Sequence, residues 1–242
     1  MTEALESWAE FKNFLAREIW KGQPPDRGHF MFRGQANAEL PLVSSFDRTF
    51  SSAPTPNSDL EQLLIDNFRR ECESENDLKE LTTNRDCLTA LAQHSGVPTR
   101  LLDWSDSPYI ASFFAFQGIV ERSGEVAIWI LDGKSKIWHA NLGVQVLSIP
   151  SWQNERMRHQ AAYFTISKTP FRTLEEYVET FETVDSTGDP LLKVTMPSDE
   201  ARMALADLDL MGINHGSLLG GLDGKAKAAV TKAVLANLTT HR

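Results

Sequence analysis

Polar side chains stand at the predicted ends of several helices and strands, which is where binding sites are commonly built. The residues concerned are Arg33, Gln35, His94, Arg100, Asp103 and Gln160. Folding alone rarely requires such groups together within an apolar frame, so the pattern predicts a pocket with a few convergent polar side chains. Arginine offers a planar fork of donors that suits carboxylate or phosphate, so the expected ligand is anionic.

Arginine also replaces lysine over long stretches of the chain. Residues 23–78 and 81–133 contain no lysine. Their arginines are Arg27, Arg33, Arg48, Arg69, Arg70, Arg85, Arg100 and Arg122. The competing interpretation is surface pairing with some of the 33 acidic residues, because most charged side chains are simply exposed.

Structural explanations compete with the binding roles at most of these positions. Arg33 and Asp103 can form a buried ion pair, for which arginine is the preferred cation. His94 stands near the end of a predicted helix and can bond the last carbonyls there. Asp103 can cap a turn at Ser105. Trp104 is favoured as a core residue over a stacking platform, because aromatic side chains dominate core burial.

Two further places in the sequence combine polar side chains with an element boundary. Arg100 lies where a loop meets a strand, close in sequence to His94 and Asp103, and is the arginine for which a binding role is favoured most. Asn154 and Arg156 precede an apolar strand, where they serve equally well as ligand contacts or as a satisfied turn.

Periodicity and capping signals predict a mixture of helices and strands. Helices are expected over residues 7–20, from 58 onward, and over 86–94, 109–120, 173–181, 198–211 and 225–238. Strands are expected over residues 29–33, 100–104, 125–131, 144–149, 163–166 and 191–195. The elements interleave without a regular βαβ rhythm, which indicates a single α+β domain over 1–242, with an N-terminal helix in 1–22 and a core in 23–242. The expected sheets are mixed or antiparallel.

Composition excludes several classes of function. The net charge of −9 disfavours non-specific binding of nucleic acid. Cys72 and Cys87 form neither a CxxC motif nor a disulfide framework, which favours a reducing compartment. The N-terminus lacks the pattern of a signal peptide, and the most apolar run, 109–120, is too short for a membrane span. We therefore expect a cytoplasmic protein without membrane contact.

Familiar catalytic motifs do not occur in the chain. The sequence has no GxGxxG, GxxxxGK[ST] or GxSxG motif, so dinucleotide-fold, P-loop and nucleophile-elbow sites are unsupported. The six histidines show no HExxH or paired spacing, so no metal site is expected.

Four segments together resemble the FRG domain family, named for the Phe-Arg-Gly that is residues 32–34 here. They are FMFRGQ (30–35), QHSGVPTRLLDWSDSPYIASFFAF (93–116), NERMRHQAAYFT (154–165) and DLDLMGINHGSLLGGLDG (207–224). The resemblance spans nearly the whole chain, and the second segment is the most specific. The last segment departs from the family pattern, because glycine stands where proline and an acid are usual.

The order of the motifs also resembles that of ADP-ribosyltransferases, which bind NAD in a cleft between two small sheets. This resemblance implies that Arg33 holds a pyrophosphate and that Trp104 stacks on nicotinamide. If Gln160 takes the third motif position, where an acid would stabilise the developing cation, the resemblance implies that the chemistry is weakened or that this role passes to Asp103, Glu155 or another acid. The predicted catalytic residues are thus Arg33, Asp103 and Gln160. The predicted substrate-binding residues are Gln35, His94, Arg100, Trp104, Ser105, Asn154 and Arg156.

The expected function is binding of NAD or a related nucleotide. The chemistry that the resemblance implies is cleavage of the N-glycosidic bond, either as ADP-ribosyl transfer or as NAD hydrolysis. The protein would then act as a bacterial effector or toxin, for example in phage defence. The alternative is a non-enzymatic sensing or protein-interaction module in which Arg33, Arg100 and Arg156 recognise an anionic ligand. A nuclease is the third hypothesis, and the acidic composition counts against it.

Overall fold

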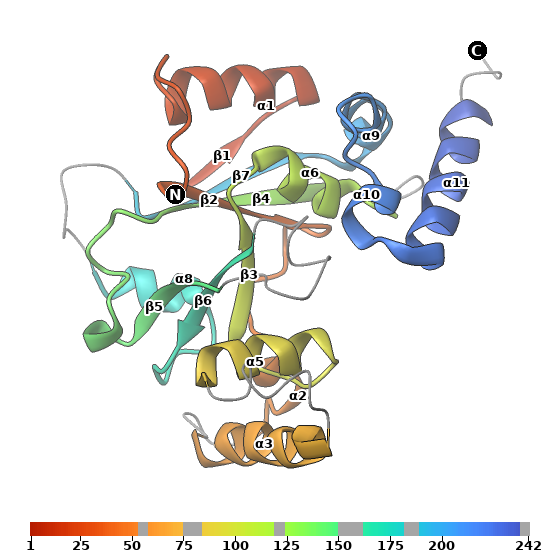
Figure 1. The fold of residues 1–242 in the computed structure, drawn as a ribbon. Coiled ribbons are helices and arrows are strands. Elements are labelled where there is room, and N and C mark those ends of the chain that lie inside the picture. Colours follow the sequence, from red (N-terminus) through yellow and green to blue (C-terminus); the bar gives the residue numbers. More distant parts are fainter. Residues whose placement is uncertain (53–57, 75–83, 119–123, 150–161, 182–188, 238–242) are drawn as a thin grey trace.

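The computed structural model describes residues 1–52, 58–74, 84–118, 124–149, 162–181 and 189–237, which form an α+β fold (Figure 1). A seven-stranded mixed sheet with the order β1-β7-β4-β2-β3-β6-β5 runs through it. The strands are β1 (Thr2–Ala4), β2 (Phe30–Gln35), β3 (Leu101–Ser105), β4 (Glu125–Asp132), β5 (Val144–Ser148), β6 (Ala162–Ser167) and β7 (Leu191–Pro197). The sequence predicted the α+β class and the mixed sheet.

Helices flank the sheet (Figure 1). The α-helices are α1 (Trp8–Phe14), α2 (Ser45–Thr49), α3 (Ser58–Glu71), α5 (Arg85–His94), α6 (Pro108–Phe116), α8 (Leu174–Glu179), α9 (Ala201–Leu210), α10 (His215–Leu219) and α11 (Gly221–Asn237). The described residues also form the π-helix η1 (Leu15–Ile19) and the 3₁₀ turns η2 (Cys72–Ser74), η4 (Ala140–Leu142) and η5 (Ser198–Glu200). Among the described residues, no helix is both long and apolar enough to cross a membrane.

The sheet consists of two groups of strands that meet at one narrow contact. β1 lies parallel to β7, and the other neighbours are antiparallel. β2 pairs with β3 only at Phe32 and Ser105, whereas β2 pairs with β4 along its whole length. Figure 1 shows β3 running across the direction of β4. The β1-β7-β4-β2 group and the β3-β6-β5 group therefore diverge beyond this contact.

Both faces of β4 are buried, which explains its continuous apolar sequence. Val126, Ile128 and Ile130 face one core, which α1, α6 and α9 cover on one side of the sheet (Figure 1). The alternate residues Ala127 and Trp129 face a second core that includes residues of α8. Successive side chains of a strand point to opposite faces, so one apolar strand serves two cores.

Helix α6 is the buried central helix that its apolar sequence predicts. The Ser107 hydroxyl accepts a hydrogen bond from the Ile110 amide at 3.3 Å, and Pro108 occupies the first turn, where its missing N–H costs nothing. The helix ends at Phe116, because Gln117 takes an extended conformation. This helix packs directly on β2 and so fixes the position of the residues around Arg33.

The α10–α11 hairpin contacts α6 through a buried histidine, whose ionisation should affect stability. The His215 ring packs edge-on against Phe113 with ring centroids 4.8 Å apart, and its Nδ1 lies 3.4 Å from the Thr231 hydroxyl. Burial lowers the pKa of His215, and the positive charge of Lys227 lowers it further. The neutral form is therefore the one that the folded state prefers.

We expect wild-type stability to fall as the pH drops below about 6.5, the usual pKa of histidine in an unfolded chain. The lowered folded pKa means that the unfolded state takes up the proton first. The stabilisation is complete above the unfolded pKa and is lost as the pH falls through the folded pKa. Urea unfolding of wild type and His215→Gln at pH 8.0 and 5.5 measures this, and the variant should lose less stability between the two pH values. Equal losses would contradict the assignment.

Candidate ligand-binding pocket

A hollow of about 280 Å³ lies at the divergence of β2 and β3, against α6. It is lined by Phe32, Arg33 and Gly34 from β2, His94 from α5, Asp103, Trp104 and Ser105 from β3, and Ala111, Phe114 and Gln117 from or next to α6. Concave sites with apolar walls and a few polar groups are the usual places for small ligands. Five of the predicted site residues therefore come together here: Arg33, His94, Asp103, Trp104 and Ser105.

The Arg33 guanidinium bridges the two groups of strands. Its Nη1 donates a hydrogen bond to the backbone carbonyl of Asp103 at 2.7 Å and lies 3.6 Å from the Asp103 Oδ2. In a continuous sheet, the Asp103 carbonyl would accept a hydrogen bond from a backbone amide of the neighbouring strand. Because β2 and β3 have separated at this level, the Arg33 side chain supplies the donor instead. Burial lowers the pKa of Arg33, the charge of Asp103 opposes this, and Arg48 lowers it further. Arginine nevertheless keeps its charge in proteins.

The Asp103 carboxylate is fixed by a second residue that the sequence did not indicate. Gln93 donates from Nε2 to the Asp103 Oδ1 at 2.7 Å, and the Gln93 Oε1 accepts a hydrogen bond from the Thr99 hydroxyl. Half of the Asp103 side chain is exposed (50%), compared with 24% of the Arg33 side chain. The site therefore presents an oriented carboxylate beside a half-buried guanidinium, open to an incoming ligand.

Gly34 allows α6 to approach the site closely. A Cβ atom at this position would collide with the carbonyl oxygen of Ala111 and would lie 2.7 Å from the Ala115 nitrogen. Only a residue without a side chain lets the helix backbone sit against the strand here. The Phe-Arg-Gly sequence thus combines a core residue, the bridging cation and the point of closest helix packing.

The aromatic side chains that line the pocket are buried to different extents. Trp104 is 2% exposed, and its indole donates to the Thr165 hydroxyl at 3.0 Å, so it is a core residue and offers no free face for stacking. Phe114 of α6 is half-buried and lines the hollow. The sequence signal for it was weak, because Phe114 lies in a run that is apolar on nearly all sides.

Two of the predicted substrate-binding residues lie elsewhere. Gln35 donates from Nε2 to the Leu40 carbonyl at 3.0 Å and accepts from the Trp129 indole at 2.8 Å, so it holds the loop after β2. Arg100 is buried and does not line the hollow. The remaining predicted site residues, Asn154, Arg156 and Gln160, lie outside the described residues.

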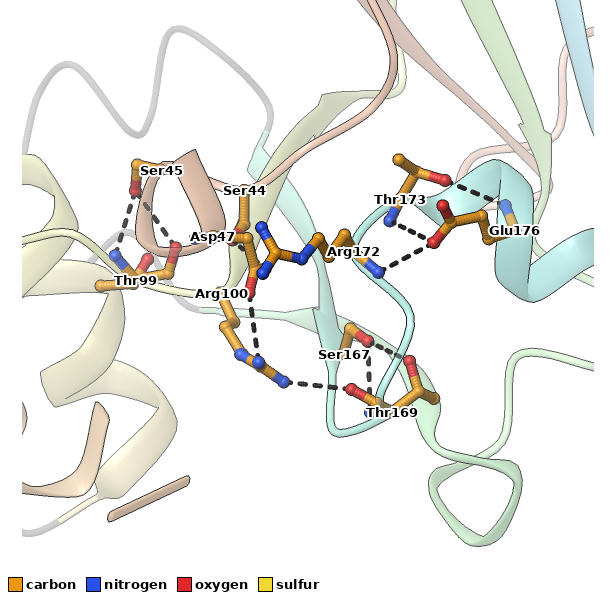
Figure 2. Close-up of polar contacts among 10 residues, drawn as sticks. All are labelled: Ser44, Ser45, Asp47, Thr99, Arg100, Ser167, Thr169, Arg172, Thr173 and Glu176. Atoms are coloured by element: carbon orange, nitrogen blue, oxygen red, sulfur yellow. Dashed lines mark hydrogen bonds and ion pairs between the residues drawn. The ribbon is translucent and has the colours of Figure 1, made fainter. Parts of the chain in front are cut away.

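Arg100 forms an internal polar cluster instead (Figure 2). Its Nη2 lies 3.1 Å from the Asp47 Oδ1, and its Nη1 donates to the Thr169 carbonyl at 3.2 Å. The guanidinium also lies over the Phe46 ring, 5.4 Å from the centroid. These contacts tie α2 to β3 and to the segment after β6, which is a structural arrangement.

A second hollow, of about 370 Å³, adjoins the first and shares Arg33 and Asp103 with it. Its other lining residues are Ser45, Arg48 and Thr49 of α2, Gln93 of α5, the turn residues Gly96, Val97 and Pro98, and Leu101 and Leu102 of β3. A larger hollow of about 490 Å³ lies near the N-terminus, but it contains none of the predicted site residues. The paired hollows around Arg33 are therefore the candidate site.

Comparison with protein families finds a similarity in this region. Residues 28–123 match the FRG domain. The match covers less than half of the chain, from the residues before β2 to the residues after α6. No curated protein and no solved structure matches the chain.

The FRG match contains every described residue that lines the two hollows around Arg33. The segments 154–165 and 207–224, which resemble the family in sequence, lie beyond it. The FRG segment therefore carries the candidate site, while β4 and the later strands complete the sheet that supports it.

Proposed function

We propose that the hollow at the β2–β3 divergence binds NAD or a related nucleotide and cleaves its N-glycosidic bond. The observation that carries this proposal is the Arg33–Asp103 pair. A half-buried guanidinium and an oriented, half-exposed carboxylate stand together in a hollow with apolar walls. Such a pair can hold an anionic group and can also stabilise a developing cation.

The divergence of the sheet adds support. The motif order predicted a cleft between two small sheets, and the site lies where two groups of strands part after a single residue pair. Arg33 comes from the first group and Asp103 from the second. An ADP-ribosyltransferase-like cleft is therefore part of the proposal.

The proposed reaction assigns a role to each group. The apolar wall at Phe114 would receive the flat nicotinamide ring, and Arg33 would bind a phosphate. As the bond between nicotinamide and ribose C1 breaks, its electron pair leaves with nicotinamide and positive charge develops on the ribose. Asp103, held by Gln93, would stabilise that charge. Water or an acceptor hydroxyl then adds to C1 and releases a proton.

The test is incubation of the purified protein with NAD, following free nicotinamide. We expect wild type to release nicotinamide and Asp103→Asn and Arg33→Lys to lose about a hundredfold or more of the rate, as is usual when a preorganised electrostatic group is removed. Asp26→Asn is the matched control, because this carboxylate pairs with Lys134 at 2.9 Å on the surface and lines neither hollow around Arg33.

Failure of wild type to release nicotinamide, with its fold intact, would contradict the cleavage. Binding of nucleotide without release would instead support the alternative, a non-enzymatic sensing or interaction module. The observation favouring that alternative is that the Arg33 guanidinium lies 3.6 Å from the Asp103 Oδ2, so the two charges proposed for catalysis neutralise each other. If NAD is consumed, a role as an effector or toxin follows from depletion of a common cofactor.

A further inference from the structure

The two hollows on either side of Arg33 differ in chemical character. The first contains the aromatic residues Phe32 and Phe114 and the apolar contact with α6. The second is lined by the polar residues Arg48 and Thr49 of α2. Since Arg33 and Asp103 line both, a ligand that contacts this pair can extend into both hollows.

The second hollow carries an excess of positive charge. Its described lining residues include two arginines, Arg33 and Arg48, and a single acidic residue, Asp103. Arg48 is exposed, and its Nη1 donates to the Val43 carbonyl. No carboxylate among the described residues lies within ion-pair distance of Arg48. In a chain with a net charge of −9, this local surplus of cations is selective for an anion.

The volumes also favour a ligand that occupies both hollows. The first hollow, of about 280 Å³, lies at the lower limit of the volumes of roughly 300–1,000 Å³ that small-molecule sites usually have. It suits a single ring with its sugar. The second, of about 370 Å³, provides room for the phosphates that such a nucleoside would carry.

We infer that Arg48 binds the phosphate groups of a nucleoside diphosphate or dinucleotide, which extends from the first hollow past Arg33 into the second. This inference rests on the proposed function and specifies the substrate class of the same site. Guanidinium groups bind phosphate oxygens through short, charge-assisted hydrogen bonds. Two of them at one hollow match the two phosphates of a pyrophosphate.

Calorimetric titration of the full chain tests this, with ADP-ribose, inorganic pyrophosphate and adenosine as probes. We expect Arg48→Ala to weaken binding of ADP-ribose and pyrophosphate about tenfold to a hundredfold, the usual effect of losing a hydrogen bond to a charged group. Adenosine, which has no phosphate, should bind both proteins equally. Arg48→Lys should recover part of the loss, because it restores the charge without the planar fork.

Arg70→Ala is the matched control, because Arg70 is also exposed and donates to a neighbour in its own segment, Asn67, at 3.2 Å. Unchanged binding of ADP-ribose by Arg48→Ala would overturn the inference, as would wild type binding ADP-ribose no more tightly than adenosine. Nicotinamide release by the same preparations separates the two proposals. If wild type releases nicotinamide but Arg48→Ala binds ADP-ribose as wild type does, the proposed cleavage stands and the phosphate site does not. If Arg48→Ala weakens binding but wild type releases no nicotinamide, only the phosphate site stands.

Discussion

Replacing Gly34 with alanine should destabilise the protein by about 3 kcal/mol or more, the upper end of the range for overpacked cores. The added Cβ would meet backbone atoms of Ala111 and Ala115 in α6. Backbone cannot rotate away as a flexible side chain can, so either α6 or β2 must move. Such a movement would also widen the hollow, because Ala111 and Phe114 line it from α6. Urea unfolding followed by circular dichroism measures the loss.

Gly216→Ala provides the control for this change. Gly216 lies within α10, and the nearest atoms to an added Cβ are side-chain atoms, the Asn214 Oδ1 at 3.2 Å and the Ala228 Cβ at 3.7 Å. Alanine is the better helix former by about 1 kcal/mol, so any cost of the tight contact should be largely offset. If Gly34→Ala were as stable as Gly216→Ala, the close approach of α6 to β2 would not be the reason for glycine at position 34.

Elements with local signals were predicted well from the sequence. The Ser107-Pro108 pair does begin α6, and Thr173 with Glu176 forms the predicted capping box of α8. The strand over 125–131 corresponds to β4. Each of these signals lies within a few residues of the element that it specifies, so a single sequence contains it.

Elements that depend on distant partners were missed or altered. β1 is only three exposed residues, and it exists because it pairs in parallel with β7 nearly the whole chain away. The helix predicted over 7–20 changes at Leu15 into a π-helix, in which the Trp20 amide bonds the Leu15 carbonyl at 2.9 Å. Both Leu15 and Ile19 are buried there, so the wider turn accompanies the packing of both into the core.

The candidate site shows the same division between local and distant information. Arg33 and Asp103 were both singled out, since each is a polar residue on a predicted strand beside apolar neighbours. The role of Arg100 was not predictable, because its partner Asp47 lies on α2, a helix that the sequence did not indicate. Arg48, on the same helix, was visible only as one of many arginines. The sequence thus indicated the polar residues on the strands and missed helix α2.

Replacing Arg100 with methionine should cost about 3–5 kcal/mol of folding stability, the usual effect of removing one partner of a buried ion pair. Arg100 and Asp47 are 2% and 6% exposed in their side chains, so the remaining carboxylate would stay buried without its cation. Glu61 would be affected too. Burial raises its pKa, and the charge of Arg100 opposes that rise. Equilibrium unfolding in urea measures the loss.

The double variant Arg100→Met/Asp47→Asn distinguishes a structural Arg100 from a ligand-binding one. Without the buried carboxylate, the methionine no longer leaves a charge uncompensated, so the double variant should be more stable than Arg100→Met alone. The Ser44 hydroxyl, which donates to the Asp47 Oδ2 at 2.6 Å, can still bond the asparagine oxygen. A binding role, as the sequence suggested, requires the opposite pattern: Arg100→Met would keep wild-type stability and lose nucleotide affinity. The contacts in Figure 2 lead us to expect a large change in stability.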